Sequence, residues 1–253
     1  MKRLVGGYTQ LAHGLPAPLF IRALEAVLLP LLTELNRSEN VVFQLALSVP
    51  FMEFLEKNHP SVNLLLADLC RNEKLEFLSH AYFQSIPSLL APKDRAYQIE
   101  QTTTYMRKRY QTRSRTLFCP HQIFSPAYIG SMNLCFLDTL MVSAHDPCIE
   151  KTYFDEPVIM QELGKRGIIL PIDDVVSRSV EAFSRKAIPF SKLHSAVRQV
   201  VESDRRFVLA LLNFDQLSTG GITPEETGQL FSALVQKGSS STEEIEGQEL
   251  PLK

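Results

Sequence analysis

The amino-acid sequence predicts an α/β fold, a distorted (β/α) barrel of about seven parallel strands. Short apolar runs alternate with longer amphipathic ones from residue 3 to about residue 236, a rhythm typical of a parallel sheet covered by helices. The short runs are apolar on both faces, as buried parallel strands are. With 253 residues, of which 45% are hydrophobic, the chain can bury one large core. We therefore expect a single barrel domain over residues 1–236.

The expected elements follow in order along the chain. Strand candidates are rich in Val, Ile, Leu and Phe and lie at 4–11, 41–47, 75–79, 116–119, 139–143, 167–171 and 207–213. Helix candidates lie between them at 18–35, 50–71, 92–110, 126–136, 190–203 and 224–235. Several of these begin with proline, which the first turn of a helix tolerates. Residues 237–253 are rich in Gly, Ser and Glu, so we expect a disordered tail there.

The composition limits the classes of binding partner that we expect. The 26 Lys and Arg residues nearly balance the 28 Asp and Glu residues, which gives no electrostatic reason to expect a nucleic acid or an anionic membrane. No apolar run is long enough to cross a bilayer. The four cysteines lack a CxxC spacing and the N-terminus lacks a signal-peptide pattern. We expect a cytoplasmic protein with reduced thiols and no cofactor, and the sequence identifies no protein partner.

Five stretches carry a family resemblance. They read LLPLLTEL at 28–35, FQLALSVPFMEFLEKNHP at 43–60, LEFLSHAYFQSIPSLLAPKDRAYQIE at 75–100, ILPIDDVVSR at 169–178 and FDQLSTGG at 214–221. In this order they resemble blocks of the catalytic barrel of glycoside hydrolase family 57, which contains 4-α-glucanotransferases and α-amylases. The resemblance spans residues 3–236 and implies the same barrel, with its site at the carboxyl ends of the strands.

The resemblance also implies the roles of particular residues. Asp215 stands at the position of the general acid, whereas His121 replaces the glutamate that serves as nucleophile. The first strand has no histidine motif, and an expected acidic pair reads Ser143-Ala144. Positions that contact sugar in the family correspond to Tyr8, Gln10, Gln84, Phe118 and Phe124.

These departures predict a degenerate member that is catalytically inactive and retains carbohydrate binding. Retaining glycosidases need two carboxyl groups about 5–5.5 Å apart, and Asp215 alone cannot both attack and protonate. Any residual activity should concern α-1,4-glucans or their oligosaccharides. Two structural roles stay open, because Asp215 could cap the turn that follows its strand and His121 could bind a backbone carbonyl.

Two further hypotheses remain. Three histidines follow strand ends, namely His80, His121 and His145; if they converge, they could bind a metal and support a deacetylase-like, metal-dependent hydrolase. Alternatively, the barrel could be a non-catalytic interaction or regulatory module. In that case aromatic residues near the mouth, including Tyr82 and Phe83, could stack on sugar rings.

Overall fold

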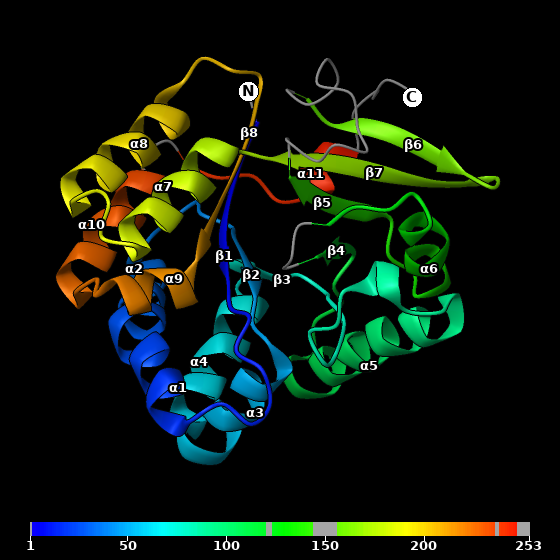
Figure 1. The fold of residues 1–253 in the computed structure, drawn as a ribbon, viewed down its shortest axis with the longest axis horizontal. Helices are drawn as coiled ribbons and strands as arrows, with labels where there is room; N and C mark the ends of the chain where they lie inside the picture. Colours follow the sequence, from blue (N-terminus) through cyan, green and yellow to red (C-terminus); the bar gives the residue numbers. More distant parts are fainter. Residues whose placement is uncertain (1, 120–122, 144–155, 236–237, 247–253) are drawn as a thin grey trace.

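A computed structural model describes residues 2–119, 123–143, 156–235 and 238–246 (Figure 1). Two four-stranded sheets, in the orders β3-β2-β1-β8 and β4-β5-β7-β6, meet at both edges. A parallel bridge between Ser79 and Leu117 joins β3 to β4, and the Asp173 N–H donates to the Leu209 carbonyl at 2.8 Å, between β7 and β8. The parallel strands thus form the ring β1-β2-β3-β4-β5-β7-β8, which confirms the distorted barrel of seven parallel strands.

All seven predicted strands are present. In chain order the strands are β1 (Lys2–Tyr8), β2 (Phe43–Ala46), β3 (Leu75–Phe77), β4 (Thr116–Phe118), β5 (Thr139–Ser143), β6 (Val158–Glu162), β7 (Lys165–Ile172) and β8 (Phe207–Asn213). The sequence did not predict β6, which pairs antiparallel with β7. The two residues between them, Leu163 and Gly164, both have positive φ, the conformation that a two-residue hairpin turn requires.

Except for the short last one, the helices pack around the outside of the ring (Figure 1). They are α1 (Ala17–Ala23), α2 (Leu29–Arg37), α3 (Val49–Asn58), α4 (Pro60–Arg71), α5 (Pro92–Tyr110), α6 (Tyr128–Leu134), α7 (Asp174–Ser184), α8 (Phe190–Glu202), α9 (Phe214–Gly220), α10 (Pro224–Val235) and α11 (Glu243–Glu246), with a π-helical turn η1 (Leu24–Leu28) and a 3-10 turn η2 (Pro87–Leu89). Within the described part of the chain, no helix is long and apolar enough to cross a membrane.

Two predicted helices are interrupted for local reasons. The first runs as α1, η1 and α2, and the π-helical turn precedes Pro30, which lacks the N–H of a regular helix. The second divides into α3 and α4 at His59, whose φ of −137° is extended, because a residue before proline is disfavoured in the helical region. The sequence did not predict α7 or α9, although Asp173 and Asn213 cap them.

Apolar side chains alternate between the interior of the barrel and its helical coat. The inward-facing cluster comprises Leu4, Tyr8, Ala46, Leu78, Phe118, Met141, Leu170, Ile172, Phe207, Leu209, Leu211 and Ile245. Neighbours in each strand, such as Val5, Leu45 and Ala210, pack outward against the helices. Gly7 allows this close packing on β1, because a Cβ there would lie 2.0 Å from the ring of Phe214.

Residues 238–246, which belong to the predicted disordered tail over 237–253, contact the barrel. The Ser240 N–H donates to the Arg3 carbonyl at 2.7 Å, and the Thr242 hydroxyl donates to Glu76 at 3.0 Å. Ile245 is fully buried in the barrel interior. One isoleucine and several backbone and hydroxyl contacts therefore hold this segment against the amino-terminal end of the barrel, although its composition is polar. The rest of the expected tail lies outside the described residues.

Candidate active site at the barrel mouth

The carboxyl ends of β1 and β8 bring three of the predicted residues together. Tyr8 and Asn213 are paired in register at the last position of their strands. The Asn213 amide donates to the Tyr8 hydroxyl and to the Gln10 side-chain oxygen, both at 3.3 Å. Tyr8 and Gln10 therefore lie at one edge of the barrel mouth, beside the start of α9.

Asp215 lies in the first turn of α9 at the same edge. Its Oδ2 accepts a hydrogen bond from the Gln10 N–H at 2.5 Å, whereas its Oδ1 is buried and has no hydrogen-bond partner in the part of the chain that the structure describes. Burial raises the pKa of this carboxyl to about 6, against the opposing effect of the Gln10 N–H. No second carboxylate among the described residues contributes to the shift. The environment therefore favours a neutral carboxyl that can donate a proton near pH 6.

The capping role considered for Asp215 belongs to Asn213. The Asn213 side-chain oxygen accepts hydrogen bonds from the N–H groups of Asp215 and Gln216, both at 3.1 Å. This arrangement gives hydrogen-bond acceptors to two N–H groups in the first turn of α9, which have no partner within the helix. The Asp215 carboxyl is consequently available for another role.

His80 is held at the end of β3 as a structural residue. It is fully buried, and burial lowers its pKa. Its Nε2 lies 2.8 Å from the Leu47 carbonyl, and its Nδ1 lies 3.2 Å from the Gln84 amide nitrogen. A neutral ring protonated on Nε2 donates to the Leu47 carbonyl and accepts from the Gln84 amide, while the Ala81 carbonyl also lies 3.1 Å from Nδ1. Gln84, predicted to contact sugar, is buried in this pair.

The metal hypothesis gains no support from this geometry, because both ring nitrogens of His80 already have partners. Within the described ranges, no group of three His, Cys, Asp or Glu side chains is arranged to hold a metal ion. The other two histidines of the hypothesis, His121 and His145, lie outside the described residues, so the predicted replacement of the nucleophile by His121 remains a prediction.

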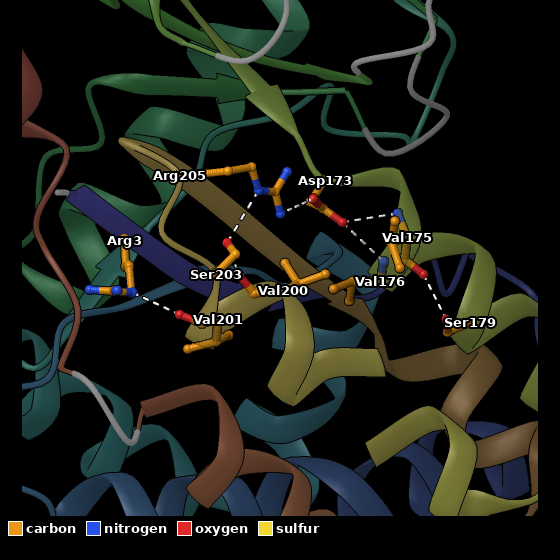
Figure 2. Close-up of polar contacts among 9 residues, drawn as sticks. All are labelled: Arg3, Asp173, Val175, Val176, Ser179, Val200, Val201, Ser203 and Arg205. Atoms are coloured by element: carbon orange, nitrogen blue, oxygen red, sulfur yellow. Dashed lines mark hydrogen bonds and ion pairs between the residues drawn. The ribbon is translucent and has the colours of Figure 1, made fainter. Parts of the chain in front are cut away.

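The two aspartates after β7 have different surroundings. Asp173 caps α7 by accepting from the Val175 and Val176 N–H groups at 2.9 and 3.3 Å, and its other oxygen pairs with Arg205 at 2.6 Å. Figure 2 shows how these contacts join the loop before β8 to the start of α7. Asp174 accepts instead from the Ser143 hydroxyl at the end of β5, at 3.0 Å. Sequence reasoning gave Asp174 no role, although its position after a buried strand was a usable signal.

The predicted aromatic contacts are distributed differently from the expectation. Phe118 is buried inside the barrel, with its ring centroid 4.8 Å from that of Tyr8, and Phe124 is buried against Tyr128 outside the ring. Both rings are buried in this structure, and a role for either in sugar binding stays a prediction. Phe83, on the loop after β3, is 59% exposed, and its ring lies 5.8 Å from that of His13.

A comparison with known protein families establishes the family of this chain. The sequence model of glycosyl hydrolase family 57 matches residues 9–194. The chain belongs to glycosyl hydrolase family 57. The mouth of the barrel carries Tyr8, Gln10 and Asp215, three of the positions at which the sequence resemblance implied a site.

Solved structures share the fold of this family-57 chain. A 4-alpha-glucanotransferase from Thermococcus litoralis matches with a TM-score of 0.80 and 17% identity, over 100% of this chain and 41% of that protein. A GH57-type branching enzyme from Pyrococcus horikoshii matches with a TM-score of 0.72 and 11% identity, over 100% and 72%.

The fold likeness extends beyond the family. A protein described as a polysaccharide deacetylase, from Mycobacterium smegmatis, matches with a TM-score of 0.71 and 10% identity, over 100% of this chain and 92% of that one. No curated protein matches the sequence. The chain spans about two fifths of the Thermococcus litoralis glucanotransferase.

Proposed function

We propose that this chain binds an α-glucan at the barrel mouth and cleaves glycosidic bonds slowly or not at all. The observation that carries the proposal is the state of Asp215. This carboxyl is largely buried, has a raised pKa and keeps one buried oxygen without a hydrogen-bond partner among the described residues, so it can donate a hydrogen bond to a sugar oxygen below about pH 6 and accept one from a sugar hydroxyl above it. Family membership makes an α-glucan the first ligand to consider.

Weak or absent catalysis follows if no second carboxylate lies beside Asp215, and none of the described residues places one there. Cleavage with retention needs a nucleophile about 5–5.5 Å from the acid, and a like charge so close would raise the pKa of Asp215 further. Burial alone accounts for the shift within the described part of the chain. At the family's nucleophile position the sequence has His121, and an imidazole offers no negative charge to an oxocarbenium-like transition state.

The proposal is tested with purified protein, maltoheptaose and amylose. We expect heat of binding by calorimetry and no short products after chromatographic separation. The His121→Glu variant returns a carboxylate to the nucleophile position, and we expect it to gain measurable hydrolysis that the added Asp215→Asn change abolishes. Wild-type turnover that requires Asp215 would overturn the claim of weak catalysis, and an absence of binding would overturn the claim of glucan recognition.

Phe83 is proposed as the stacking surface for one sugar ring. Its exposed side chain follows β3 at the mouth, and it contacts His13 from the loop after β1. We expect Phe83→Ala to weaken maltoheptaose binding about 3- to 10-fold, because an aromatic contact contributes on the order of 1 kcal/mol. Calorimetric titration measures this change.

Phe136 provides a matched control for that variant. It is 74% exposed and precedes β5, so it lies at the opposite end of the barrel. Phe136→Ala should leave maltoheptaose affinity unchanged. Equal losses in both variants would show that Phe83 has no specific role.

A cytoplasmic location belongs to the same proposal. Cys70, Cys119 and Cys135 are free thiols, which suits a reducing compartment. Burial also raises the pKa of the Cys119 thiol to about 12, so this thiol is unreactive at neutral pH.

A further inference from the structure

A second cavity lies at the amino-terminal end of the barrel, opposite the mouth. Its volume is about 360 Å³, within the range of pockets that hold small ligands. The starts of β3 and β4 form its walls, and the segment 241–244 covers one side. Glu73 and Arg113 are exposed at its rim, whereas Gln44 is fully buried at its floor.

The Gln44 amide is the unusual feature of this cavity. Both its Nε2 and its Oε1 are buried and have no hydrogen-bond partner among residues 2–119, 123–143, 156–235 and 238–246. Burying a primary amide in this state is unfavourable, and native proteins rarely leave one unexplained. The strand β1 fixes its position, because a Cβ on Gly6 would lie only 2.7 Å from the Gln44 Cβ. The amide therefore offers a donor and an acceptor to whatever occupies the cavity.

The surrounding groups describe the chemistry of an occupant. The walls carry the hydroxyls of Ser114, Thr116, Ser241 and Thr242 beside the apolar side chain of Leu78. Among the charged lining residues, Arg115 pairs with Asp138 and Glu244 pairs with Lys2. Glu76 accepts hydrogen bonds from the Thr242 N–H and hydroxyl, and Glu73 and Arg113 carry opposite charges. Polar walls without a strong net charge favour a neutral ligand with many hydroxyls. Vicinal hydroxyls of a sugar ring match the paired donor and acceptor of an amide.

We propose that this cavity is a binding site for a neutral, monosaccharide-sized polyol, with a free hexose as the first candidate. Gln44 anchors two adjacent hydroxyls at the floor, and the rim residues remain in contact with solvent. The site lies at the other end of the barrel from Asp215 and does not depend on the function proposed for the mouth.

The test compares D-glucose with its mirror image L-glucose. Both sugars change the properties of the solvent equally, so only a specific site can distinguish them. We expect D-glucose to raise the Tm of the wild-type protein more than L-glucose does, and calorimetry to detect one site. Gln44→Met keeps an unbranched side chain of similar length and removes the amide. We expect this variant to lose at least tenfold in affinity, while its ligand-free Tm rises by about 2–4 °C because an unpaired buried amide is gone.

Phe83→Ala separates this site from the mouth and should bind D-glucose as the wild type does. A hexose response that is lost in Phe83→Ala and kept in Gln44→Met would assign the binding to the mouth and overturn the proposal. Equal responses to both enantiomers, or a ligand-free Tm that falls sharply in Gln44→Met, would mean that the amide serves only ordered water or the fold.

Discussion

Replacing Arg95 with methionine is expected to lower the free energy of unfolding by about 3 kcal/mol or more, because buried carbonyls lose charged donors. Arg95 is buried in the first turns of α5. Its guanidinium donates to the carbonyls of Pro87 at 2.8 Å, Leu90 at 3.1 Å and Ala127 at 2.9 Å. One side chain thus joins the loop after β3, the start of α5 and the start of α6. Urea unfolding measures the effect.

The position of Arg95 makes carbonyl contacts the main source of this stabilisation. A positive charge near a helix amino terminus opposes the helix dipole, and none of the described carboxylates forms an ion pair with Arg95. Its guanidinium carbon lies 5.3 Å from the centre of the Tyr128 ring. We therefore expect Arg95→Lys to lose most of the same stability, because an ammonium cannot reproduce the planar fork.

Arg107→Met is the control for Arg95. Arg107 is exposed on the same helix, so its replacement should change the free energy of unfolding by less than about 0.5 kcal/mol. If Arg95→Met behaves like this control, the three carbonyls must have alternative donors and the network would be dispensable. The loop that Arg95 holds also carries Phe83, so glucan binding should weaken together with stability.

The strands were predictable because their signal is local. A parallel strand buried on both faces is a continuous apolar run, and all seven such runs became strands. Helices α7 and α9 were missed because each begins directly after a strand, so that the run 207–213 and the residues after it read as one apolar segment. Strand β6 was missed because Val158–Glu162 has only one well-buried residue.

The site was only partly predictable, because strand alternation decides where each side chain points. Tyr8, Gln10 and Asp215 lie together, as adjacent strand ends suggested. Phe118 faces the barrel interior below Tyr8, and Phe124 packs outside the ring against Tyr128. The sequence shows that these residues are aromatic, but the exposed fraction of each side chain depends on neighbours from other strands. The raised pKa of Asp215 likewise depends on burial by distant segments.

Asp215→Asn is expected to stabilise the protein at pH 7 by about 3 kcal/mol and to have little effect at pH 4. The pKa of Asp215 is raised from 3.8 to about 6 in the folded state. Between these values the folded chain binds a proton that the unfolded chain has released, so the free energy of unfolding falls as pH rises. A shift of about two pH units corresponds to about 3 kcal/mol. Asparagine avoids this cost and can still accept the Gln10 N–H bond.

Urea unfolding of both proteins between pH 4 and pH 8 measures the difference, with Asp68→Asn as the control. Asp68 is an exposed aspartate on α4, and its variant should differ from the wild type by an amount that hardly varies with pH. A destabilised Asp215→Asn protein at pH 7 would mean that the carboxylate is held by a cation, and the role of Asp215 as proton donor would fail. A stabilised variant that binds maltoheptaose more weakly would show that the unfavourable burial of this acid is retained for recognition, since functional groups commonly reduce stability.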